Sequence, residues 1–172
     1  MSSRVKRNKM LPQYEKYLQL AQKNKNENKK FLEKLRKQKP AGLDVLIQKL
    51  DEEVFEYIDC LECANCCKTT GPLLLNKDID RLAKELKMRP AIFTENYLKV
   101  DEDGDYVFQN KPCPFLGSDH YCSVYNARPN ACREYPHTQQ RDQIQKLKIT
   151  FQNSLICPAV AQIVERLKKM PI

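Results

Sequence analysis

The sequence has no tryptophan, only four glycines, and no apolar run long enough to cross a membrane. So few glycines exclude the Gly-rich loops that cradle phosphates in nucleotide-binding proteins. The longest uncharged stretch, residues 149–164, is too short and too polar for a transmembrane helix. The basic first ten residues run into the next segment without the apolar stretch of a secretory signal. We therefore expect a cytoplasmic protein with no membrane span.

Cysteine, by contrast, is abundant. Four of the eight cysteines stand within eight residues, where crowded thiolates would repel each other and oxidise unless a cation or disulfides held them. A reducing cytosol favours metal over disulfides, and a bond between the adjacent Cys66 and Cys67 would require a strained ring. The expected metal ligands are Cys60, Cys63, Cys66, Cys67, Cys113, Cys122, Cys132 and Cys157.

Two kinds of metal centre suit these cysteines. The Cys-x2-Cys-x2-Cys spacing from Cys60 to Cys66 supplies three thiolates to a 4Fe-4S cluster, with a fourth often on a Cys-Pro such as Cys113 or Cys157. Alternatively, eight thiolates divide into two four-cysteine zinc sites. Spacing alone does not choose between zinc and iron. A thioredoxin-like redox pair is disfavoured, because its βαβ context is absent and Cys67 has no part in it.

The block at Cys60–Cys67 is followed by three further motifs, at residues 78–83, 113–116 and 122–136. In this order the four motifs resemble the CxxCxxCC family of zinc- or iron-chelating proteins, also called YkgJ family cysteine cluster proteins. The resemblance implies a cytosolic bacterial protein, usually with no assigned reaction. Flagellin lysine methylases are similar in their cysteine region, so the alternative is an iron-sulfur electron carrier or a methylase-like enzyme. Every cysteine except Cys157 matches the family pattern, and Cys157 is included as a later ligand.

The basic charge lies at one end of the chain. Residues 1–40 carry a net charge of +10, whereas residues 41–172 carry −2. Clustered lysines attract nucleic acid, but here they surround a polar face with no aromatic stacking platform. We therefore expect no nucleic-acid partner, and a protein partner of the N-terminal helices is the alternative. The sequence does not indicate an oligomeric state.

Apolar residues at helical spacing predict a mostly helical fold with one small β-hairpin. The first helix, after Pro12, has polar residues in the middle of its apolar seam, so we expect a break near residues 24–28. An acidic turn at 101–105 predicts the β-hairpin, and Asn76 is a candidate cap for the helix it starts. Further expected elements are helices over 43–57, 76–86, 90–98 and from Pro158, and a short strand over 147–151.

We expect three segments: a basic helical segment over 1–40, the second helix of an N-terminal hairpin over 41–58, and a compact cysteine-cluster domain over 59–172 that ends in a helix. Four residues near the later cysteines are secondary candidates. The guanidinium groups of Arg128 and Arg133 could donate hydrogen bonds to thiolates. His120 and His137 could replace a cysteine as imidazole ligands, although eight cysteines do not require them.

Overall fold

The computed structural model describes residues 10–171, of which most are helical, with one small antiparallel sheet. The predicted fold class is therefore confirmed. The chain divides into two compact units, of which one comprises residues 64–135 and contains the sheet. The other comprises residues 10–63 together with 136–171. We call them the sheet unit and the helical unit. No helix within residues 10–171 is long and apolar enough to span a membrane.

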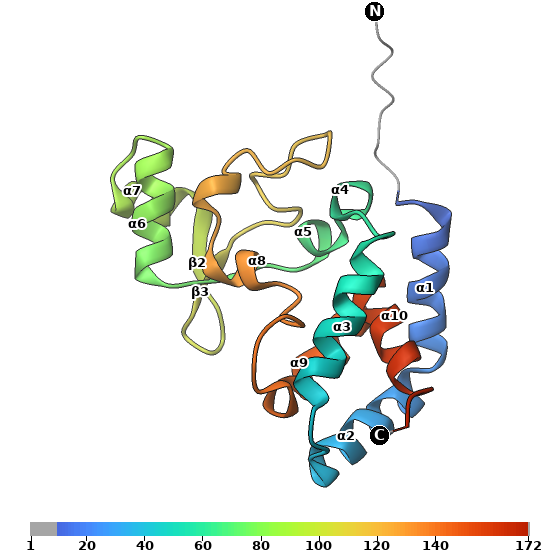
Figure 1. Cartoon of the computed structure of the whole chain (residues 1–172). Helices are drawn as coiled ribbons and strands as arrows, with labels where there is room; N and C mark the ends of the chain where they lie inside the picture. The colour runs from blue at the N-terminus through green and yellow to red at the C-terminus, as the bar shows by residue number, and fades with distance from the viewer. Residues whose placement is uncertain (1–9, 172) are drawn as a thin grey trace, which may run out of the picture. The chain divides into compact units, whose positions relative to one another are not determined.

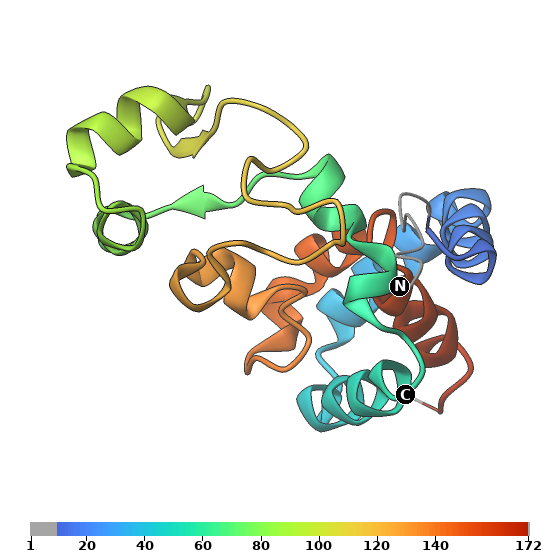
Figure 2. The ribbon, with the colours of Figure 1, turned by 90° about the horizontal axis from the view of Figure 1, so that it is seen from above.

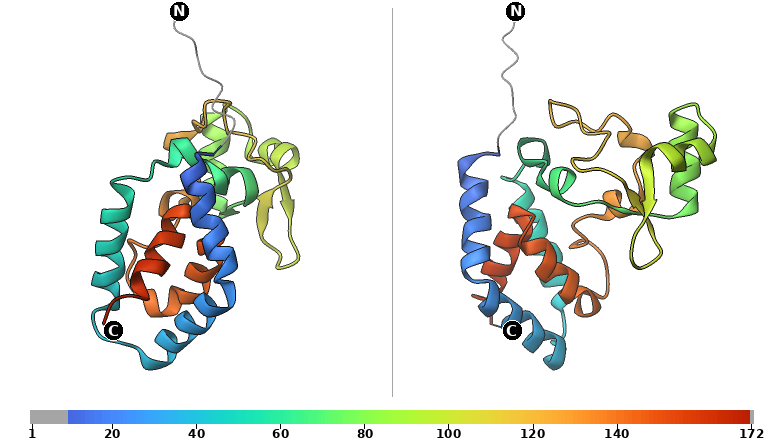
Figure 3. Two further views of the ribbon diagram at one scale, coloured as in Figure 1. Left: turned by 90° about the vertical axis from the view of Figure 1, so that its right-hand side faces the viewer. Right: turned by 180° about the vertical axis from the view of Figure 1, so that it is seen from behind.

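The helical unit is built around α10 (Pro158–Leu167), which packs against α1 (Pro12–Lys23), α3 (Leu43–Phe55) and α9 (Gln143–Ser154). Figures 1 and 3 show α10 between α1 and α3. The α2 helix (Lys25–Gln38) packs against α9. The main contacts of the three N-terminal helices are thus with the C-terminal helices, which the sequence pattern did not indicate.

The core of the helical unit follows the predicted apolar stripes. In α10, Val160, Ile163, Val164 and Leu167 are fully buried. The break in the first helix falls at Asn24, between α1 and α2, within the region where the polar seam predicts it. Tyr57 is an exception to the expected stripe of α3, because it lies beyond the helix and is exposed.

The strand expected over residues 147–151 is wrong, because this segment lies inside α9. The β-branched Ile149 and Thr150 favour a strand locally. However, the buried residues of α9 recur at helical rather than alternating spacing: Leu147, Thr150, Asn153 and Ser154. The Asp44 carboxylate also accepts hydrogen bonds from the backbone N–H groups of Asp142 and Gln143, at 2.8 and 2.9 Å. Asp44 therefore satisfies donors at the start of α9.

The sheet unit contains β1 (Leu73–Leu74), β2 (Leu98–Val100) and β3 (Tyr106–Phe108), in the order β1-β3-β2. The predicted hairpin is formed by β2 and β3. In its turn, the Asp101 carboxylate accepts hydrogen bonds from the N–H groups of Asp103 and Asp105. Figures 1 and 2 show α6 (Asn76–Glu85) and α7 (Pro90–Tyr97) side by side. Phe93, Phe108 and Phe115 form the aromatic centre of this core.

The start of α6 differs from the expected cap. Asn76 is the first helical residue, and the Asp78 carboxylate accepts the hydrogen bond from the backbone N–H of Leu75 instead. Asp78 is almost fully buried and also accepts from Arg81 and from the backbone N–H of Asn130. Arg81 in turn donates to the carbonyl of Arg128. These contacts fix the start of α8 (Asn130–Glu134) against α6.

Candidate metal centre

The CxxCxxCC block is divided between the two units. Cys60 and Cys63 lie in α4 (Cys60–Cys63) of the helical unit, whereas Cys66 and Cys67 lie in α5 (Asn65–Thr69) of the sheet unit. Ala64 lies between them with a φ of 49°, in the left-handed region that a residue with a Cβ rarely occupies. The block is thus two pairs of cysteines rather than one continuous loop.

Backbone hydrogen bonds bring Cys113 beside Cys67. The N–H of Cys113 donates to the carbonyl of Cys67 at 2.8 Å. Two residues later, Phe115 is buried and its ring lies 6.3 Å from that of Phe93 and 5.6 Å from that of Phe108. The Cys-Pro-Phe motif therefore anchors a cysteine loop in the aromatic core, which explains why an apolar ring follows this cysteine so closely.

A tight fold of the chain returns Cys122 toward Cys113. The N–H of Ser123 donates to the carbonyl of Phe115, and the N–H of Gly117 donates to the carbonyl of Tyr121, at 2.8 and 2.7 Å. A Cβ on Gly117 would lie 2.6 Å from a carboxylate oxygen of Asp119, which is closer than Cβ contacts allow. A side chain at this position would displace the Asp119 carboxylate, which accepts a hydrogen bond from the N–H of Tyr121, and the cysteine pattern did not reveal this tight turn.

Cys132 reaches the same region from α8. Its N–H donates to the carbonyl of Pro129 at 3.0 Å, and the buried Asp78 holds the start of the helix. Asp78 and Arg81 belong to the second motif of the sequence, but their positioning role was not anticipated. The sequence does contain an indication of this role. Asp78 and Arg81 are three residues apart on one predicted helix, a spacing at which oppositely charged side chains commonly pair.

Electrostatics identify four cysteines of the sheet unit as one group. Burial, together with negative charge on neighbouring cysteines, raises the pKa of Cys113 to about 11 and that of Cys132 to about 12. Burial is also the main cause that raises the pKa of Cys122. The hydrogen bond with Cys66, whose sulfur lies 4.0 Å away, lowers the pKa of Cys67 to about 7. We call Cys67, Cys113, Cys122 and Cys132 the four-thiol set.

A second group lies in the helical unit. Cys157 precedes α10, where the N–H groups of Ala159 and Val160 face its sulfur, and burial raises its pKa to about 12. Negative charge on Cys60 and Cys63 contributes to this raised pKa, so these three sulfurs share one neighbourhood. The phenol oxygen of Tyr14 accepts a hydrogen bond from the N–H of Asp59, which ties the start of α4 to α1. We call Cys60, Cys63 and Cys157 the three-thiol set.

The secondary candidates are in varied surroundings. Arg128 stacks over the ring of Tyr125, 3.7 Å from its centroid, and its charge favours the thiolates of Cys122 and Cys132. Arg133 instead donates hydrogen bonds to the carbonyls of Arg128 and Asn126. It therefore fixes the chain segment that leads into α8.

The two histidines lie in different units. His120 is buried, with Nε2 2.9 Å from the ammonium of Lys68. The carbonyl of His137 accepts a hydrogen bond from the Gln143 amide in the helical unit.

None of the eight cysteines, all of which lie in the described part of the chain, forms a disulfide. Within residues 10–171, no three Cys, His, Asp or Glu side chains already stand in a geometry that would hold a metal ion. The structure thus places thiols together in two neighbourhoods without preformed coordination.

A family model described as "Putative zinc- or iron-chelating domain" matches residues 59–157, which is more than half of the chain. The chain belongs to this CxxCxxCC family, which confirms the resemblance seen in its motifs. The match ends at Cys157, so all eight cysteines lie within it. No curated protein and no solved structure matches the chain.

Proposed function

We propose that the protein chelates zinc or iron through cysteine thiolates, at one site in each unit. The observation that carries this proposal is the four-thiol set, in which Cys67 shares one neighbourhood with three cysteines of the distant segment 109–135. The proposed ligands are Cys67, Cys113, Cys122 and Cys132 in the sheet unit, and Cys60, Cys63 and Cys157 in the helical unit. Cys66 is the eighth proposed ligand.

The raised pKa values explain why a cation is needed. Four half-buried thiols cannot all ionise side by side, because each thiolate loses hydration and repels the others. A divalent metal ion offsets this cost, since it binds the deprotonated sulfurs and supplies the missing positive charge. Four thiolates suit a closed tetrahedral zinc site, and the same donors suit an iron-sulfur cluster. Either centre would draw the sulfur atoms closer together.

We place this activity in the cytoplasm, where a reducing environment keeps cysteines available as metal ligands. Binding of the ion would also stabilise the sheet unit, because its cysteine segments would be cross-linked by the metal. Chelation is thus proposed as a structural property of the fold, and no reaction is assigned to it.

Metal analysis tests the proposal. The protein is purified anaerobically, and zinc, iron and acid-labile sulfide are measured per chain. Zinc in a colourless protein would identify zinc-thiolate sites, and brown colour with sulfide would identify a cluster. A metal-free protein that stays metal-free after reduction and incubation with Zn²⁺ or Fe²⁺ would refute chelation.

Two single substitutions test whether there are separate sites. Because the two thiol sets lie in different units, Cys132→Ser and Cys157→Ser should each remove about half of the bound metal, and the double variant should remove nearly all. Ser118→Ala, an exposed position between Cys113 and Cys122 that offers no thiol, is the control and should retain the metal. Loss of all metal in either single cysteine variant would instead mean that the cysteines hold one shared centre.

A further inference from the structure

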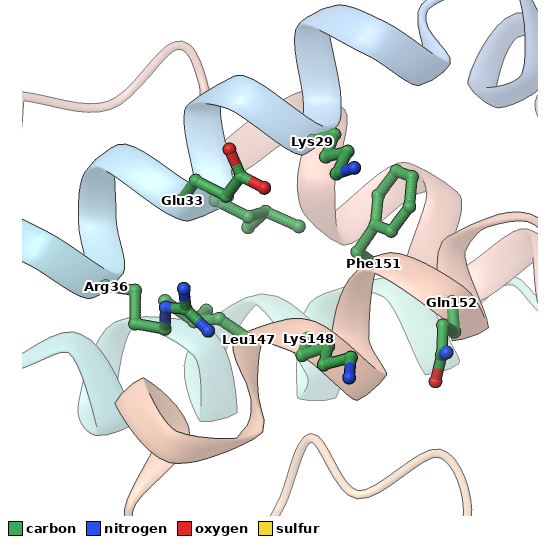
Figure 4. A pocket seen from close by; sticks show the side chains of 8 residues that line it. Lys29, Glu33, Arg36, Leu147, Lys148, Phe151 and Gln152 are labelled. Atoms are coloured by element: carbon green, nitrogen blue, oxygen red, sulfur yellow. The ribbon is translucent and has the colours of Figure 1, made fainter.

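A groove of about 470 Å³ lies on the helical unit between α2 and α9, away from the proposed metal ligands in the sequence. In Figure 4, Lys29, Glu33 and Phe151 reach toward the same space between the two helices. Its volume is in the range of sites that take a small molecule or a few side chains of a partner. The lining residues are Lys29, Leu32, Glu33, Arg36, Leu147, Lys148, Phe151 and Gln152.

The spacing of the lining residues shows that the groove consists of two helix faces. Those from α2 stand at positions i, i+3, i+4 and i+7, and those from α9 stand at i, i+1, i+4 and i+5. Leu32 and Leu147 are buried at its base, and Phe151 is half-buried. Two adjoining helix faces with an apolar base form the surface on which a third helix packs, by placing its side chains between theirs.

The charges of the groove select the partner. Lys29, Arg36 and Lys148 are exposed, and none of them forms an ion pair with another residue in the described part of the chain. In contrast, Lys168 at the end of α10 pairs with both Glu27 and Glu165. The groove lining thus carries three cations against the single carboxylate of Glu33, and it is complementary to an acidic surface.

The positions of these cations favour an extended ligand over a compact one. Lys29 and Arg36 are seven residues apart on α2, which separates them by about 10 Å along the helix axis. A single phosphate group would leave the apolar part of the lining at Leu32 and Phe151 uncovered, whereas a helix with carboxylates two turns apart would match both the cations and the apolar residues. We propose that this groove binds an acidic amphipathic helix of a partner protein, with an apolar side chain over Leu32 and Phe151 and carboxylates facing Lys29 and Arg36.

A designed peptide tests this proposal. The probe is a fluorescent, helix-stabilised peptide of about 21 residues, with two Glu seven positions apart and Leu between them on the same face. Its binding is followed by fluorescence anisotropy in about 0.15 M salt, where long-range attraction is screened. The double charge reversal K29E/R36E should weaken binding about tenfold or more. The matched control K30E/K37E changes the same helix by the same charge at the same spacing and should weaken it less than about twofold.

Charge exchange provides a second readout. A peptide with Lys in place of the two Glu should bind K29E/R36E and not the wild-type protein. Helicity of both variants, measured by circular dichroism, shows that they remain folded. Equal weakening by the two double variants would overturn the proposal, because it would reveal unspecific attraction to a basic helix. So would the absence of saturable peptide binding, or tighter binding of a 20-nucleotide poly-dT that K29E/R36E abolishes, which would identify a nucleic-acid site.

Discussion

Cys67 and Cys132 carry the same side chain, yet their surroundings favour opposite ionisation states. Cys132 is desolvated and faces other thiols, which raises its pKa to about 12. Cys67 has a neighbouring thiol that donates to it and the positive charge of Lys68 beside it, and its pKa falls to about 7. Spacing alone identified both residues as candidate ligands. The difference between them could not be predicted, because it depends on how the distant cysteine segments fold around them.

This difference predicts the order in which the metal-free thiols react. A thiol with a pKa near 7 is about half ionised at neutral pH, and only the thiolate attacks an alkylating agent. Cys67 should therefore react with iodoacetamide at pH 7 well before Cys113 or Cys132, whose rates should increase only at strongly alkaline pH. Mass spectrometry of the digested protein measures each rate. Cys66→Ser should slow the reaction of Cys67 at pH 7, and equal rates for Cys67 and Cys132 would contradict the assignment.

Elements with strong patterns were predictable. The buried stripe of α10 and the prolines that open α7 and α10 gave correct helices, because helix periodicity and Pro at the first turn are local signals. The helix α9 was not predictable from its β-branched residues alone, because its conformation depends on packing against α2 and α10. The division of the cysteine block at Ala64 was hidden as well, since alanine gives no sequence signal for a left-handed conformation.

The junction between α4 and α5 predicts a contrast between two substitutions at Ala64. Its left-handed φ of 49° is accessible to glycine without steric cost, whereas a β-branched side chain is strongly disfavoured there. Ala64→Val should lower the free energy of unfolding by about 1 kcal/mol or more and reduce the metal content. Ala64→Gly should keep both near the wild-type values. Urea denaturation and metal analysis provide the measurements, and similar losses in both variants would show that the Ala64 methyl group matters rather than its φ.

At the scale of the whole molecule, the two units differ in what holds them together. The helical unit has a continuous apolar core around α10. In the sheet unit, the segment between β3 and the end of α8 contains only the short η1 (Tyr125–Ala127) and α8 as regular elements. Three cysteines of the four-thiol set lie in this segment. The sequence predicted the helices and indicated the cysteines as candidate metal ligands. It could not predict their distribution over two units, because the helical unit combines two segments far apart in the sequence, 10–63 and 136–171.

Removal of the metal should therefore loosen one part of the molecule more than the other. The segment 109–135 has little regular secondary structure, so it depends on cross-links between its cysteines and the metal. A chelator such as EDTA under reducing conditions should therefore abolish the protection of its backbone amides from hydrogen exchange. The α10 helix beyond its first turn should stay protected, because its apolar side chains remain buried. Exchange followed by mass spectrometry measures both segments in one sample. Cys132→Ser should reproduce the loss in 109–135 without chelator, whereas equal deprotection of α10 would show that the metal stabilises the entire chain.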